Sequence, residues 1–395
     1  MLSGSAISGT RHVRSQLERM VDGVLALQAA GRDPARGGLL LYWPQVASNP
    51  FHGTLYARGF DNDWAVLPLD EVGGPLGQAG VPVTVHIHWI HRLFSRITRR
   101  REAVARADAF LDRLAGLQAD GTHLVWTVHN LLAHHSDFPG VERDTCARLA
   151  DLVDSIHVMN PDTVALAASH YQLPAHKVFH VPHPAYGPVY GAYMGRAQAR
   201  LDLGLRPADV AILLFGALLP YKGIRQTIAR LDSLQKLARP GGQVRLILAG
   251  GRGPDHFMAE LEQLTAARSD VSVYAGHVSD QAVQTYFRAA DVVACPYPVS
   301  LNSGVAMTGV SFGRPVVVPN SLMAVFSGAG AMVQGFDPAA FHSLDGALAQ
   351  ALAAADDSSA RGQLQAFVAD HDPAHVSDRF FKALAARRHG AAVTA

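Results

Sequence analysis

The stretch YPVSLNSGVAMTGVSFGRPVVVP, residues 297–319, places an uncharged polar loop directly before an apolar segment and a β-branched run. The overlapping run DVVACPYP, residues 291–298, is typical of a buried strand. VAMTGVSFG favours a helix, and RPVVVPN favours a second strand. Neighbouring parallel strands need a crossover of this kind between them. The stretch therefore predicts a strand, a loop, a helix and a strand within a parallel sheet.

The loop of this unit has the composition of an anion-binding site. Asn302 or Ser303 would cap the helix, and the backbone N–H groups of Ser303, Gly304 and Val305 would point beyond the strand end. Free N–H groups at a helix start attract phosphate, whereas a carboxylate at this place would repel it. The alternative is an ordinary capped helix without a ligand.

The same alternation of strand and helix extends over most of the chain, in two series. Helical stretches such as REAVARADAFLDRLAGLQ and RDTCARLADLVD separate the strand-like runs, and VSDRFFKALAARRHG predicts a helix at the C-terminal end. The first series comprises GGLLLYWP, WAVLPL, VTVHIHW, HLVWTVHN, SIHVMN and KVFHVPHP, and the second VAILLFG, VRLILAGG, VSVYAG, DVVACPYP and RPVVVPN.

Two such series predict an α/β protein with two Rossmann-like, doubly wound domains and an interdomain cleft. We expect one domain over residues 1–190, including an N-terminal helical extension, and a second over 191–375. A C-terminal helix and tail would occupy 376–395. The stretch around residue 190 is rich in Gly, Pro and Tyr and has no strand pattern, which indicates a linker.

The composition excludes several classes of function. Of 395 residues, 49% are hydrophobic and the net charge is only +1, which argues against nucleic-acid binding. No apolar run has the length of a membrane span, and the first twenty residues lack the apolar core of a signal peptide. The two cysteines, Cys146 and Cys295, lie far apart and suggest neither a disulfide nor a metal site. A cytoplasmic location is therefore expected.

Two further stretches favour phosphate binding after strands. In FGALLPYKG, Gly216 follows a strand and Lys222 precedes a helix, so a full positive charge would lie beside free N–H groups. In LAGGRG, Gly250 and Gly251 follow another strand and would permit close backbone approach. A solvated lysine and a simple tight turn are the alternative explanations.

These motifs together carry a family resemblance. FGALLPYKG, LAGGRG, YAGHVSDQAVQTYFRAADVVACPYP and NSGVAMTGVSFGRPVVVPN resemble, in order and spacing over about residues 205–325, the nucleotide-sugar-binding domain of GT-B glycosyltransferases around glycosyltransferase family 4. The resemblance implies a GT-B fold, with the acceptor bound by the N-terminal domain. It implies metal-independent transfer of a sugar from a UDP- or GDP-sugar to a saccharide or lipid-linked glycan acceptor, in bacterial polysaccharide or glycan biosynthesis. No cofactor besides this substrate is expected. It also places His277, Val278 and Thr308 among the donor-binding residues.

The sequence departs from the family 4 pattern at three positions. The two glutamates that the family carries in its last motif fall on Ser300 and Thr308, and its phosphate-binding arginine falls on Ala217. The chain more closely resembles bacterial exopolysaccharide glycosyltransferases that have LNSG in place of the first glutamate. Lys222 is retained, so donor binding is expected, whereas retention or inversion at the sugar stays open.

Histidines at predicted strand ends are the candidate catalytic groups. His129 in WTVHN would lie opposite the nucleotide domain, and the resemblance implies contact with the donor sugar. If the enzyme inverts, His129, Asp137 or His88 would accept the proton of the acceptor hydroxyl. The alternative for each histidine is a packed residue of the core. Zinc is rejected, because no spacing matches a metal site.

The acceptor side is predicted from two other stretches, NPFHG (residues 49–53) and HIHWIH (residues 86–91). NPFHG follows the first strand, where the resemblance implies a loop that faces both substrates; a simple Asn-Pro turn is the alternative. The residues assigned to this side are Asn49, Phe51, His52, His86 and Trp89.

The segment from Arg92 to Arg106 holds six arginines and one glutamate. Leu93, Phe94, Ile97 and Val104 form a partial apolar stripe within it. We expect it to dock on an anionic membrane surface, peripherally on the inner face, because a lipid-linked acceptor would be presented there. The alternative is a solvated helix whose apolar residues pack on the sheet.

Two other functions remain open from the sequence. The chain could be another GT-B enzyme, such as a nucleotide-sugar epimerase or hydrolase. The missing glutamates also fit a non-catalytic partner subunit that binds a sugar nucleotide.

Overall fold

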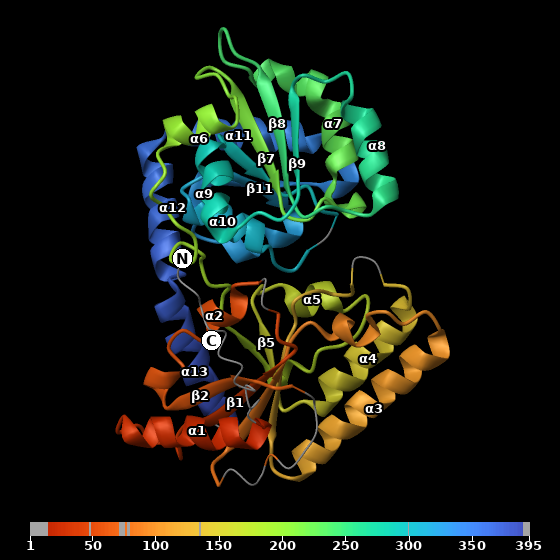
Figure 1. Ribbon diagram of the computed structural model, residues 1–395, viewed down its shortest axis with the longest axis vertical. Helices are drawn as coiled ribbons and strands as arrows, with labels where there is room; N and C mark the ends of the chain where they lie inside the picture. The colour runs from red at the N-terminus through yellow and green to blue at the C-terminus, as the bar shows by residue number, and fades with distance from the viewer. Residues whose placement is uncertain are drawn as a thin grey trace, which may run out of the picture.

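The computed structural model describes residues 15–46, 49–70, 76, 80–133, 136–298 and 300–389. The described residues form two six-stranded sheets, one on each side of residue 190 (Figure 1). The predicted helical extension begins as helix α1 at Gln16, and residues 1–14 lie outside the described residues.

The first sheet has the strand order β2-β1-β3-β4-β5-β6, and every neighbouring pair is parallel. All five residues of β3 are buried, as expected for a parallel strand with helices on both faces. Its strands are β1 (Gly38–Trp43), β2 (Trp64–Pro68), β3 (Val83–Ile87), β4 (His123–Thr127), β5 (Ser155–Val158) and β6 (Val178–His180).

The second sheet has the order β12-β11-β10-β7-β8-β9 and is also parallel throughout. The alternating runs predicted every strand except β12, whose sequence VQGF has a glycine and a polar residue at its centre. The strands are β7 (Val210–Phe215), β8 (Val244–Gly250), β9 (Val271–Ala275), β10 (Val292–Ala294), β11 (Val316–Pro319) and β12 (Val333–Phe336).

Helices cover both faces of both sheets (Figure 1). The first domain contains α1 (Gln16–Ala29), α2 (Phe51–Leu55), α3 (Arg100–Ala119), α4 (Pro139–Leu152) and α5 (Thr163–Ala167). The second contains α6 (Arg196–Asp202), α7 (Ile224–Leu234), α8 (Asp255–Thr265), α9 (Asp280–Ala289), α10 (Gly304–Ser311), α11 (Ser343–Ala354) and α12 (Ser358–Asp370), and α13 spans Pro373–Arg388.

Helix α13 returns from the second domain to the first. Figure 1 shows α12 and α13 in blue, running along one side of both domains. Phe380 and Phe381 are buried in a core that also contains Phe51 of α2 and Trp64 of β2. The chain therefore crosses between the domains twice, once near residue 190 and once near residue 372.

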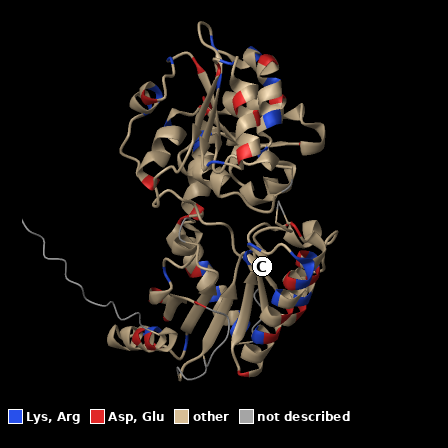
Figure 2. Ribbon diagram, turned by 45° about the vertical axis from the view of Figure 1, so that its right-hand side comes forward, with Lys and Arg blue, Asp and Glu red and all other residues tan. Residues whose placement is uncertain are grey.

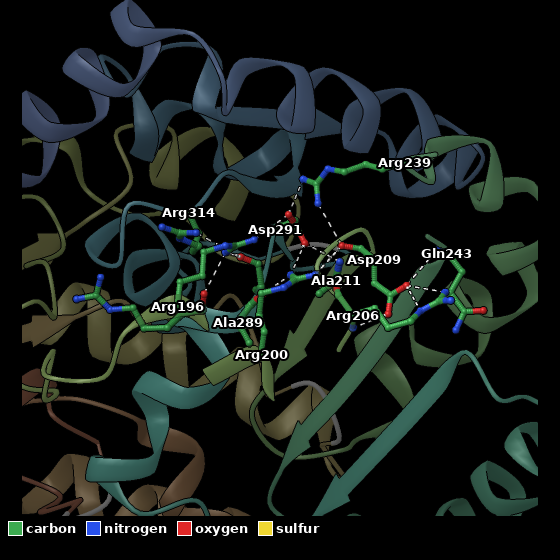
Figure 3. Close-up of polar contacts among 12 residues, drawn as sticks. Arg196, Arg200, Arg206, Asp209, Ala211, Arg239, Gln243, Ala289, Asp291 and Arg314 are labelled. Atoms are coloured by element: carbon green, nitrogen blue, oxygen red, sulfur yellow. Dashed lines mark hydrogen bonds and ion pairs between the residues drawn. The ribbon is translucent and has the colours of Figure 1, made fainter. Parts of the chain in front are cut away.

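A buried carboxylate fixes the end of the second sheet that lies away from the first domain. The side chain of Asp291, just before β10, is 4% exposed and pairs with Arg196, Arg200 and Arg239 at 2.7–3.0 Å (Figure 3). Its Oδ2 also accepts a hydrogen bond from the N–H of Ala211 in β7. Burial alone would raise the pKa of Asp291, but this bond and the guanidinium groups outweigh burial and hold the pKa below its ordinary value.

Replacing this carboxylate should destabilise the second domain. We expect Asp291→Asn to lower the free energy of unfolding by roughly 2–4 kcal/mol, because the buried Arg200 loses its counter-charge. The side chains of Arg196 and Arg239 are 37% and 48% exposed, so water screens their ion pairs and these pairs contribute less to the loss of stability. Denaturant unfolding measures the change. Asp255→Asn is the control, since Asp255 is 95% exposed and pairs only with exposed Arg252. Equal stability of the two variants would contradict this role.

Candidate active site

A cavity of about 490 Å³ lies between the two domains, at the carboxyl ends of the strands. Its volume is within the usual range for a small-molecule site, and parallel α/β sheets place their ligands at this edge. Its lining comprises Val46, Asn49, Pro50, Phe51, Trp89, His129, Asn130, His183, Tyr186, Tyr190, Phe215, Gly216, Tyr221, Lys222, Tyr297, Ser300, Asn302, Ser303, Gly304, Val305 and Thr308.

On the second-domain side, Lys222 lies across the end of β7. Its Nζ is 3.4 Å from the carbonyl oxygen of Phe215. A Cβ on Gly216 would lie 2.7 Å from this nitrogen, and Gly216 has φ +93°. The backbone conformation therefore favours glycine at this position, and a larger residue would also displace the end of the Lys222 side chain.

Lys222 is a half-buried cation without a carboxylate partner among the described residues. Burial lowers its pKa to about 8. Its close neighbours are Cys295 and the ring of Tyr297, 5.8 Å away, and burial raises the pKa of both groups, so both are neutral near pH 8. An ammonium group without a counter-ion is energetically unfavourable in such a place. A bound anion would remove this cost.

The start of helix α10 lines the cavity beside Lys222. Ser303 is the N-cap, and its Oγ accepts a hydrogen bond from the N–H of Ala306 at 3.1 Å. The loop is tightly held, because Ser300 Oγ donates to the carbonyl of Asn302. Thr308 donates its hydroxyl proton to the carbonyl of Gly304 and so faces the cavity only as an acceptor. The polar loop is thus a helix start aimed at the same space as a half-buried ammonium group.

The first domain faces this pair with aromatic side chains and a histidine. The rings of His129 and Trp89 are stacked 4.1 Å apart, and Phe51 meets His129 edge-on at 4.8 Å. Asn302 Nδ2 donates to the carbonyl oxygen of His129 at 3.3 Å, which links the two walls of the cavity. NPFHG was predicted as a loop, but helix α2 begins within it at Phe51. The N–H of Phe51 donates a hydrogen bond to Asn49 Oδ1.

Several residues singled out from the sequence lie outside this lining, and their predicted roles stay predictions. His86 and His88 are fully buried in the first sheet, His52 is buried against Tyr42, and Asp137 is exposed before α4. Gly250 has φ +139°, and a Cβ there would lie 2.3 Å from the carbonyl of Gly216, so backbone packing accounts for it. Gly251, exposed His277 and half-buried Val278 lie beyond the lining as well.

The sequence analysis missed the tyrosines of the cavity. Tyr186 and Tyr190 come from the segment predicted as a linker, whose HPAY also fits the family pattern, and Tyr186 OH lies 3.5 Å from Asn49 Oδ1. The Tyr186 ring packs closely against Gly304, where a Cβ would lie only 3.2 Å from the ring. The repeated tyrosines of HPAYGPVYGAY were the available signal. His183, Tyr221 and Tyr297 were also missed.

Among the residues that the structure describes, no three His, Cys, Asp or Glu side chains gather as a metal site. None of the helices in the described ranges combines the length and apolar character that crossing a membrane requires.

Comparisons with known proteins agree on the fold. Residues 209–350 match the family described as "Glycosyl transferases group 1". A crystal structure of Anabaena HepE in complex with UDP superposes with a TM-score of 0.62 at 16% identity, over 88% of this chain and 99% of that one. Sucrose-phosphate synthase from Thermosynechococcus elongatus gives 0.64 at 15% identity, over 88% and 98%. The chain has the GT-B fold of glycosyltransferases, and its second domain is a glycosyl transferases group 1 domain.

Curated relatives share shorter segments. A GDP-mannose:glycolipid 4-beta-D-mannosyltransferase of Xanthomonas campestris pv. campestris is 26% identical over 235 residues, 60% of each chain. A D-inositol 3-phosphate glycosyltransferase of Segniliparus rotundus is 33% identical over 127 residues, 31% of this chain and 27% of the relative. This chain thus spans less than two thirds of the lengths of these relatives.

The lowered pKa of Lys222 predicts pH-dependent anion binding. Above about pH 8 the free protein carries a neutral Lys222, so binding a diphosphate must take up a proton. Affinity for UDP or GDP should therefore fall by about tenfold per pH unit above pH 8. Calorimetric titration with each nucleotide from pH 7 to 9.5 measures this slope. Lys222→Met should bind weakly with no such slope, and a slope that persists in this variant would exclude Lys222 as its source.

Proposed function

We propose that this protein transfers a sugar from a UDP- or GDP-sugar to a saccharide or lipid-linked glycan acceptor in bacterial polysaccharide or glycan biosynthesis. The observation that carries the proposal is the ammonium group of Lys222, which has no carboxylate partner among the described residues, beside the start of α10 and with His129 across the cavity. The relative that uses GDP-mannose and a glycolipid, and the neighbour bound to UDP, support this substrate class.

The cavity offers the parts that such a transfer needs. Lys222 and the N–H groups of Gly304 and Val305 would hold the diphosphate, whose negative charge grows as it leaves. The second domain would bind the nucleotide sugar, and the first domain the acceptor. The aromatic wall of Phe51 and Trp89 would orient the acceptor hydroxyl beside the donor sugar. No metal ion is required in this scheme, because the lysine and the helix start supply the positive charge.

Exposed arginines of the first domain support a peripheral membrane role for the proposed transferase. Strand β3 ends at the cleft edge, and all six arginines between Arg92 and Arg106 are exposed. Leu93 and Ile97 are buried in the protein, so the apolar stripe packs inward and attraction to lipid would be electrostatic alone. Acidic residues lie among the basic ones on the flanking helices, as Figure 2 shows and the Arg106–Glu102 pair illustrates, which moderates the attraction.

Donor turnover tests the activity. Purified protein with UDP- and GDP-sugars should release nucleoside diphosphate only when a saccharide or lipid-linked acceptor is added. Lys222→Ala should weaken diphosphate binding by roughly 1.5–3 kcal/mol while affecting a nucleoside far less. His129→Ala should lower kcat/KM by roughly 10²–10⁴-fold if His129 is the base. Release without an acceptor would indicate a hydrolase or epimerase instead, and binding without any turnover would indicate a partner subunit.

Lipid binding is tested by co-sedimentation with vesicles that contain 30% phosphatidylglycerol, at low and raised salt. Replacing Arg99, Arg100 and Arg101 by Ser should weaken binding by about 3 kcal/mol, roughly 100-fold, at about 1 kcal/mol per basic residue. A matched triple variant at Arg36, Arg252 and Arg361, three exposed arginines elsewhere, should bind nearly as the wild type does. Equal binding of the two variants, or binding to neutral vesicles, would overturn the membrane role.

A further inference from the structure

Six polar side chains form one continuous hydrogen-bonded series through the interior of the first domain. They come from the segment after α2 and from three neighbouring strands or their ends, and five of them do not reach the cavity. Helix α13 covers the series, because the Phe380 ring stacks on His86 at 5.3 Å with an interplanar angle of 9°. The members, named here the histidine series, are His129, His88, Tyr56, His86, Thr127 and His157.

The inner end of the histidine series fixes its direction. His157 Nε2 lies 3.0 Å from the carbonyl oxygen of Val181, which can only accept, so Nε2 carries the proton. Burial lowers the pKa of His157 to about 3, so the ring is neutral and its Nδ1 is an acceptor. The Thr127 hydroxyl, 2.9 Å away, must donate to it. Thr127 Oγ1 is then the acceptor for His86 Nε2–H at 2.6 Å.

The same reasoning continues outward to the cavity. Tyr56 OH donates to His86 Nδ1 at 2.8 Å and accepts from His88 Nε2–H at 2.7 Å. The remaining nitrogen of His88, Nδ1, accepts from His129 Nε2–H at 2.9 Å. Burial lowers the pKa of His86, His88 and His129 well below the ordinary value, which keeps these rings neutral. Each ring N–H and each hydroxyl proton of the histidine series is thus assigned to one atom.

We infer that the histidine series holds the proton of His129 on Nε2 and leaves a lone pair on Nδ1. Nδ1 of His129 makes no hydrogen bond within the described part of the chain, and His129 is the member that lines the cavity. Toward a ligand, His129 is therefore an acceptor of hydrogen bonds and not a donor. His88 uses both ring nitrogens inside the protein and acts as a positioning residue.

This inference rests on the proposed function for its use in catalysis. As the acceptor oxygen bonds to the anomeric carbon, the bond from that carbon to the diphosphate breaks and its electron pair leaves with the diphosphate. The hydroxyl proton then passes to Nδ1 of His129. The opposite tautomer would present N–H to the hydroxyl group and could not take this proton. Thr127 would thus govern the reaction through three intervening side chains, without touching the substrate.

Thr127→Val tests the inference at a distance from the cavity. Without the hydroxyl, His86 can place its proton on Nδ1, and Tyr56 and His88 can reverse their bonds. We expect ¹⁵N NMR of the histidine rings to show His129 on Nε2–H in the wild type, and mixed or on Nδ1–H in the variant. Thr127→Ser should restore the Nε2–H form. Thr84→Val is the matched control, since Thr84 is fully buried on β3 and its hydroxyl has no partner among the described residues.

Tyr56→Phe breaks the histidine series at a second point and should also release the tautomer. If His129 keeps Nε2–H in both variants, or carries Nδ1–H in the wild type, the inference is wrong. An equal change in Thr84→Val would likewise overturn it. Where transfer is measured, Thr127→Val should lower kcat at least about tenfold with little change in KM for the donor. The NMR result needs no substrate, so it still decides the inference if no transfer is found and the proposed function fails.

Discussion

The return of helix α13 to the first domain is the packing interaction on which the arrangement of this protein depends. Its buried face, with Phe380 and Phe381, covers one side of the first sheet, although the chain has by then completed the second domain. Arg388 donates to the carbonyls of Arg36 and Gly37, and the N–H of Arg58 donates to Ser377 Oγ. The same helix covers the histidine series, since the Phe380 ring stacks on His86.

The second domain treats charged side chains in opposite ways at its two ends. At the end away from the cleft, Asp291 is surrounded by three guanidinium groups and a backbone N–H, so every strong acceptor position is used. At the cleft, Lys222 is half-buried and faces a thiol, a phenol and a carbonyl. The first arrangement secures strands β7 and β10. The second is costly without a ligand, which is the reason to propose that an anion binds there.

The buried histidines show why residue type alone did not identify function. His86, His88 and His129 occupy similar places at the ends of neighbouring strands, and each could have been a packed residue or a catalyst. In the structure His129 lines the cavity, whereas His86 and His88 are enclosed. The ring nitrogens of His86 are hydrogen-bonded to Tyr56 and Thr127, and those of His88 to Tyr56 and His129. Position relative to the cavity separates them, and a strand pattern does not contain that information.

The sequence by itself determined the local elements and the chemistry of the donor side. Alternating strand and helix patterns predicted eleven of the strands, because a parallel strand buried on both faces is a continuous apolar run, and β12 was missed because VQGF is not such a run. The sequence also predicted a cap at Asn302 or Ser303, of which the structure has Ser303, and it placed Gly216 and Lys222 in one loop. Only the tertiary structure decided which distant residues meet: the tyrosines of the linker beside Gly304, the packing of Gly250 against Gly216, and the single direction of the histidine series. These depend on approaches between segments far apart in the chain, and such approaches leave no periodic signal in the sequence.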